Sequence, residues 1–174
     1  TIAKRLIILL AVPLLVLVGL GIFVRMQLAR IEVHSRFMAE SQIVSLAVLG
    51  NISRSFTELR VNVRSYLLST DKAEQARAQA FFDEDKADVT RLLRQYSGSL
   101  VTDDRDRRLL NEYQTLSREW ITGAEKVISL AAAGRREDAR LLMLSGPIAD
   151  LGGSLSKVSS EWIQHNEELA AIAG

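Results

Sequence analysis

Residues 141–173 read LLMLSGPIADLGGSLSKVSSEWIQHNEELAAIA, and apolar side chains recur in them at alternating spacings of three and four. This spacing keeps one side of an α-helix apolar, so it predicts a long helix packed against other helices. Gly146-Pro147 interrupts the stretch, and we expect a kink or a restart there because proline lacks a backbone N–H and clashes with the preceding turn. The positions expected to face inward are Leu141, Leu144, Ile148, Leu151, Leu155, Val158, Trp162, His165, Leu169 and Ile172.

Three earlier segments show the same periodicity, and turn signals separate them. Either Thr70 or Asp71 suits the first N-cap, either Thr102 or Asp103 suits the second, and Gly134 suits a C-terminal cap. We therefore predict helices at about 25–69, 72–98, 103–133 and 136–173. Four amphipathic helices joined by short turns predict an all-α protein, an antiparallel up-down-up-down four-helix bundle. The expected inward residues are Leu49, Ile52, Phe56, Leu59, Val63 and Tyr66; then Ala78, Phe82, Val89, Leu92 and Tyr96; then Leu109, Tyr113, Leu116, Trp120, Gly123, Val127 and Leu130.

The composition of the chain argues against several classes of function. The chain has 174 residues, no cysteine, and 22 basic against 21 acidic residues. It lacks the basic excess typical of nucleic-acid binders, and without thiols it can form no disulfide or thiolate metal site. No catalytic grouping, phosphate-binding loop or cofactor motif is present, so we predict that it is not an enzyme and holds no cofactor or metal.

Residues 6–24, LIILLAVPLLVLVGLGIFV, carry no charge. As a helix they would span about 29 Å, the thickness of a bilayer's hydrocarbon core. The run is longer than a signal peptide's apolar region and no small-residue cleavage site follows it, so we predict that 1–24 forms an uncleaved membrane anchor with a short cytoplasmic flank. Basic residues on both sides leave the orientation open from charge alone. Because four antiparallel helices return the chain to its starting end, we expect a second membrane helix after residue 174.

The stretches GRREDARLLMLSGPIADL (134–151) and NEELAAIAG (166–174), together with the anchor and the four helices, carry a resemblance. The chain resembles the four-helix-bundle periplasmic sensor domain of bacterial methyl-accepting chemotaxis receptors and related sensor kinases. The resemblance covers essentially the whole chain and implies that 25–174 lies in the periplasm, anchored in the inner membrane. It also implies a homodimer, ligand binding near the dimer interface, and signalling by a small displacement of the last helix.

The sequence leaves the output of the module, its ligand and the role of its first helix open. The module could serve a chemotaxis receptor, a histidine kinase or a diguanylate cyclase, or the chain could be a structural membrane-anchored coiled coil without a ligand. The ligand could be a small carboxylate or a periplasmic binding protein. The apolar seam of the first helix could mediate dimerisation or could pack against the last helix of its own chain.

The stretch ELRVNVRSYLLST (58–70) places Arg60 and Arg64 one helical turn apart. In amino-acid-sensing members of the family, arginines at this spacing hold the ligand carboxylate, so the resemblance implies an anion site at Arg60 and Arg64. The match is incomplete, because Ser55 stands where a third arginine is expected and no hydroxyl residue directly follows Pro147. The competing interpretation is that both arginines are solvated residues beside the seam.

Three other residues attract attention by their chemistry. His165, Trp120 and Trp162 all fall on the predicted inward faces. A histidine in such a position suits packing more than metal binding or pH sensing, and the two tryptophans suit a core more than a ligand site. We therefore expect all three side chains in the core.

Overall fold

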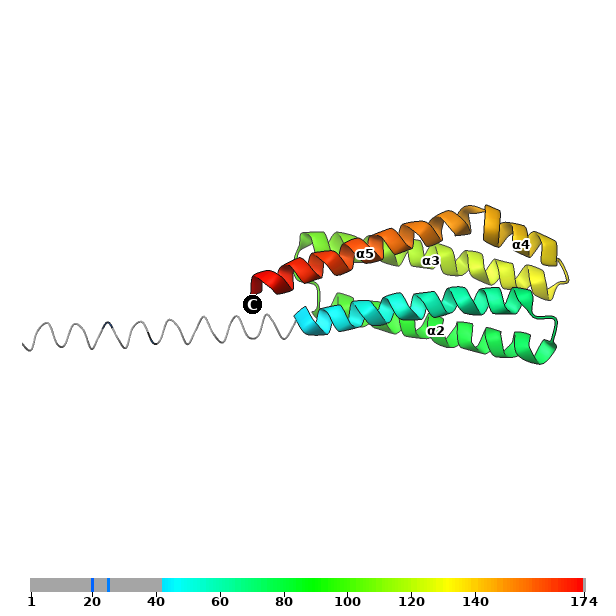
Figure 1. Cartoon of the computed structure of the whole chain (residues 1–174), viewed down its shortest axis with the longest axis horizontal. Helices are drawn as coiled ribbons and strands as arrows, with labels where there is room; N and C mark the ends of the chain where they lie inside the picture. The colour runs from blue at the N-terminus through cyan, green and yellow to red at the C-terminus, as the bar shows by residue number, and fades with distance from the viewer. Residues whose placement is uncertain (1–19, 21–24, 26–41, 174) are drawn as a thin grey trace, which may run out of the picture.

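The computed structural model describes residues 20, 25 and 42–173 (Figure 1). The first helix is described over residues 42–68, and α2 (Lys72–Ser99), α3 (Asp104–Ala132), α4 (Arg136–Ser145) and α5 (Pro147–Ala173) follow. The predicted membrane anchor and the start of the first helix lie outside the described residues, apart from positions 20 and 25. Within the described part of the chain, no helix is both long and apolar enough to span a membrane.

The helices run lengthwise beside one another, and successive arms of the bundle run in opposite directions, with α4 and α5 running in the same direction (Figure 1). The turns after the first helix and after α3 lie at one end of the bundle, which we call the distal end. The turn between α2 and α3 lies at the other end, near residue 42 and the end of α5. Together α4 and α5 form the fourth arm, so the predicted all-α antiparallel four-helix bundle is confirmed.

The apolar seam of the first helix is buried inside the bundle of a single chain. Ile52 is 1% exposed, and Phe56 packs edge-on against Trp120 with ring centroids 4.9 Å apart. All six predicted seam residues are buried, as are all five predicted residues of α2. The seam is therefore buried within its own chain, which favours the interpretation that it packs inside the bundle over the one in which it mediates dimerisation.

The predicted register of the last arm is wrong before Pro147. Leu141 and Leu144 are 48% and 59% exposed, whereas Ala139 and Met143 are buried in their place. The cause is Gly146, whose extended backbone (φ −103°, ψ −177°) ends α4 completely, so that α5 restarts in a different rotational register. From Ile148 to His165 the predicted inward positions are buried or half-buried, while Ile172, in the last turn of α5, is 83% exposed.

The turns follow the predicted capping chemistry. Asp71 accepts a hydrogen bond from the Ala73 N–H and caps α2, and Asp103 accepts one from the Asp106 N–H and caps α3. Gly134 adopts a left-handed backbone (φ +81°) after α3, where glycine carries no steric cost. These caps fix where each helix begins or ends, and so set which side chains meet at the two ends of the bundle.

Candidate functional site

A groove of about 420 Å³ opens at the distal end of the bundle, between the end of the first helix and α4. Its size falls within the range of small-molecule sites. Three guanidinium groups and one carboxylate lie among apolar side chains there. The groove is lined by Arg64, Leu67, Leu68, Arg136, Glu137, Arg140, Met143 and Leu144.

Hydrogen bonds hold two of the arginines in place. Arg136 donates to the Ser69 carbonyl and so ties the first turn of α4 to the end of the first helix. Arg140 donates through Nε to Glu137 Oε2 at 3.0 Å, and this pairing lowers the pKa of Glu137. Arg64 forms no ion pair with any described residue, which leaves its guanidinium group able to bind an anion.

The two arginines that were predicted to form one site, Arg60 and Arg64, lie in two different places. Arg64 lines the distal groove, whereas Arg60, one turn earlier and half-buried, lies against α5. A Cβ atom added to Gly152 would lie 3.7 Å from the Arg60 guanidinium and 3.7 Å from the Trp120 indole nitrogen, so the Arg60 side chain lies close to the backbone of α5 at this position. Both arginines face the fourth arm, but only Arg64 contributes to the groove.

The groove combines charge with apolar surface. Leu68 is 83% exposed and Leu144 is also exposed, while Met143, which lines the same groove, is buried. Exposed leucines beside guanidinium groups suit a ligand with an apolar body and an anionic group, because each part then meets a surface of its own kind. Sequence reasoning found Arg64 but missed Arg136 and Arg140, since only the fold brings α4 beside the first helix.

A buried polar cluster lies at the opposite end of the bundle. Asp106 is fully buried, and its carboxylate accepts hydrogen bonds from the Tyr96 hydroxyl, the Trp162 indole, the Thr102 N–H and hydroxyl, and the Asn166 amide. Burial, together with the charge of Asp106, raises the pKa of Tyr96. The carboxylate is fully satisfied by protein donors, so the cluster joins α2, α3 and α5 and offers no site for a ligand.

Asp106 was missed from the sequence, although a signal was present: it stands three residues before Leu109, on the inward face of α3. Next to it, His165 is buried with Nε2 3.0 Å from Asp103 Oδ2, so the prediction of a packed, satisfied histidine is confirmed. Both tryptophans are also in the core, as predicted. Among the residues that the structure describes, no three metal-ligating side chains come together.

Comparison with known proteins agrees with this architecture. A family model described as a four helix bundle sensory module for signal transduction matches residues 1–173. The chain belongs to this family. The resemblance to chemotaxis-receptor sensor domains is thereby confirmed, and the sensory module is a part of a receptor. No curated protein matches the chain, and neither does any solved structure.

Proposed function

We propose that this sensory module is the extracytoplasmic part of a transmembrane signalling receptor in the bacterial inner membrane. The receptor that we propose is a chemotaxis receptor. The family match over residues 1–173 supports this proposal, and so does the apolar segment 6–24, which is long enough to anchor the module. Histidine kinases and diguanylate cyclases carry modules of the same kind and are the alternative outputs. A structural role without a ligand is the remaining alternative.

The ligand we propose is a small carboxylate with an apolar portion, bound in the distal groove. Guanidinium groups bind carboxylates through two parallel hydrogen bonds, and Arg64 forms no ion pair with a carboxylate among the described residues. Arg140 is paired with Glu137, but both side chains are more than half exposed, so this ion pair costs little to exchange for a ligand. The single observation behind the assignment is Arg64 facing Arg136 and Arg140 across the groove.

Binding there would act on the signalling helix directly. Arg64 belongs to the first helix and Arg140 to α4, so a carboxylate held by both would pull the fourth arm toward the first helix. Ile148, at the start of α5, packs closely against Gly123 of α3, so α5 has little room to move toward α3 at this point. We propose that a small displacement of α5 carries the signal toward the membrane.

We also propose that the module works as a homodimer, through a different face from the buried seam. Val61 and Leu68 are exposed and lie seven residues apart, so they share one face of the first helix. Leu141 and Leu144 add exposed apolar surface on the neighbouring α4. Apolar surface gathered on one side of a bundle in this way is typical of a protein–protein interface.

The test is thermal unfolding of the detergent-solubilised chain with succinate, citrate and benzoate. A ligand bound only to the folded state at a hundredfold excess over its Kd adds about 2.7 kcal/mol. For a chain of this size that raises Tm by roughly 5–11 °C. Arg64→Ala should abolish the rise with succinate and citrate and reduce it with benzoate, and Arg108→Ala, an exposed arginine outside the groove, should leave it intact. If none of the three acids changes Tm, direct carboxylate sensing is wrong and the ligand-free or binding-protein alternatives gain support.

A further inference from the structure

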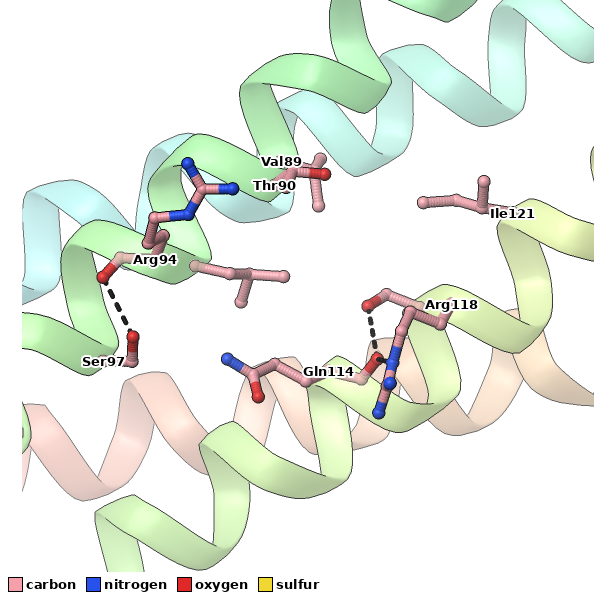
Figure 2. Close-up of a pocket in the computed structure, with 9 residues that line it drawn as sticks. Val89, Thr90, Arg94, Ser97, Gln114, Arg118 and Ile121 are labelled. Atoms are coloured by element: carbon pink, nitrogen blue, oxygen red, sulfur yellow. Dashed lines mark hydrogen bonds between the residues drawn. The ribbon is translucent and has the colours of Figure 1, made fainter.

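A second groove runs between α2 and α3, formed by different helices from the distal groove (Figure 2). It encloses about 310 Å³ and is lined by Val89, Thr90, Leu93, Arg94, Ser97, Gln114, Ser117, Arg118 and Ile121. It opens into an adjoining recess of about 510 Å³, which shares Thr90, Arg94, Arg118 and Ile121 and adds Lys86, Ala87, Arg91 and Thr122. We call the two together the α2–α3 groove.

The charged side chains that line this groove are all basic. Four basic side chains line it and no aspartate or glutamate does, although the whole chain has a net charge of only +1. Lys86 pairs with Glu125 at 2.9 Å, and Arg91 pairs with Asp88 at 2.9 Å. Their charges are thus largely neutralised by carboxylates that lie outside the groove.

Arg94 and Arg118 differ from these two, because neither forms an ion pair with a carboxylate in the part of the chain that the structure describes. They rise from opposite walls of the groove, Arg94 from α2 and Arg118 from α3 (Figure 2). Arg118 donates through Nε to the Gln114 carbonyl at 3.2 Å, which steadies the side chain while its terminal nitrogens remain available. In Figure 2 the two guanidinium groups point away from each other, but both side chains are exposed and line the same groove, so both can turn over its mouth toward an anionic occupant.

The floor of the groove is apolar. Val89 and Leu93 of α2 are buried, and Ile121 of α3 is half-buried opposite them. Ser117 stands at a buried position of α3 and fills less space than an aliphatic side chain would, which helps to leave the cavity open. The Gln114 amide projects into the same space and adds a polar group that can hydrogen-bond an occupant (Figure 2).

We propose that the α2–α3 groove is a second binding site, for an organic monocarboxylate with an apolar body. The apolar body lies on Val89, Leu93 and Ile121, and the carboxylate binds the guanidinium groups of Arg94 and Arg118. The occupant bridges α2 and α3 and thereby stabilises their packing. This site goes beyond the proposed function, because it stands on different helices and does not require the distal groove to bind anything.

The test is calorimetric titration of the detergent-solubilised 174-residue chain with phenylacetate. Its neutral isostere phenylacetamide and inorganic phosphate are titrated in parallel. We expect phenylacetate to bind, and each of Arg94→Gln and Arg118→Gln to weaken it by about tenfold or more, because each removes a charge-assisted hydrogen bond. Phenylacetamide and phosphate should bind at least tenfold more weakly, since each lacks one of the two features that the groove recognises. Arg77→Gln changes an exposed arginine of α2 outside both grooves and should leave affinity unchanged.

Two further variants separate the grooves. Thr90→Phe places a ring at the exposed mouth of the α2–α3 groove and should block phenylacetate, with far-UV circular dichroism confirming that the helices remain. Arg64→Ala removes the anion-binding arginine of the distal groove, and the phenylacetate binding that remains in this variant should still be weakened by Arg94→Gln and by Arg118→Gln. No binding of phenylacetate at millimolar concentration overturns the second site. So does binding that Arg64→Ala abolishes while Arg94→Gln and Arg118→Gln have no effect, and that result would support the distal groove instead.

Discussion

Gly123→Ala probes the contact that positions the start of α5 against α3. A Cβ atom at Gly123 would lie 2.7 Å from Ile148 Cγ1 and 2.8 Å from Cδ1. Carbon atoms prefer separations of about 3.5–4.0 Å, so the side chains or the helices must move apart by roughly 1 Å. Ile148 is buried and β-branched within a helix, so its χ1 angle has little freedom to relieve the contact.

The expected size follows from two opposing effects. Overpacking a close-packed site costs about 1–3 kcal/mol, whereas alanine is favoured over glycine inside a helix by about 1 kcal/mol. Gly123→Ala should therefore lower the free energy of unfolding by about 0–2 kcal/mol. Gly153→Ala is the matched control: this glycine lies inside α5 with nothing within 4 Å of an added Cβ, so the same change should stabilise the protein by up to about 1 kcal/mol.

The assay is urea unfolding of both variants, followed by circular dichroism. The control removes the helix-propensity effect, so the gap of about 1–3 kcal/mol between the two variants measures the contact with Ile148 alone. Ile148→Ala in the Gly123→Ala background should remove most of the clash and shrink its cost in a double-mutant cycle. If Gly123→Ala stabilises the protein as much as Gly153→Ala does, α3 and α5 do not approach as described.

Three other perturbations have clear outcomes. Asp106→Ala leaves several buried hydrogen-bond donors without an acceptor, at a cost of about 1–3 kcal/mol each. Urea unfolding should therefore show that the free energy of unfolding falls by more than about 3 kcal/mol. Partial burial raises the pKa of Asp103, but hydrogen bonds from the Asp106 N–H and from His165 outweigh it and leave the pKa below 3.8. The resulting stability is present above that pH and is lost as the pH falls through the folded-state pKa, so Asp103→Asn should lose less stability on acidification from pH 6 to pH 3. In membranes, Val61→Cys should crosslink between subunits and Ile52→Cys should not, and the reverse would contradict the buried seam.

Much of the fold was readable from the sequence because local rules agreed with one another. The spacing of Phe82, Val89 and Tyr96 in α2 matched a helix with one buried face, and Asp71 and Gly134 marked where helices begin or end. Each of these signals depends only on residues within a turn or two. The long-range topology then followed from short connections between long helices.

The errors arose where local rules gave no information. The spacing of Leu141 and Leu144 fitted the register of α5, but one extended residue at Gly146 rotated α4 relative to it. An added Cβ at Gly146 would lie 2.7 Å from the Leu142 carbonyl oxygen, so this break depends on the glycine. The sites were harder still, because Arg136 and Arg140 meet Arg64 only through the folded bundle.

The most direct test of the proposed function measures whether a carboxylate in the distal groove moves α5 against the first helix. The chain has no cysteine, so Thr57→Cys and Lys157→Cys introduce two exposed spin-label sites, one on each helix. Doubly labelled chains are diluted with unlabelled protein in membranes, and electron–electron dipolar spectroscopy gives the distance with and without the acid that raises Tm. The account predicts a shift of about 1–2 Å that Arg64→Ala abolishes. An unchanged distance at saturating acid, or a shift that persists in Arg64→Ala, would contradict it.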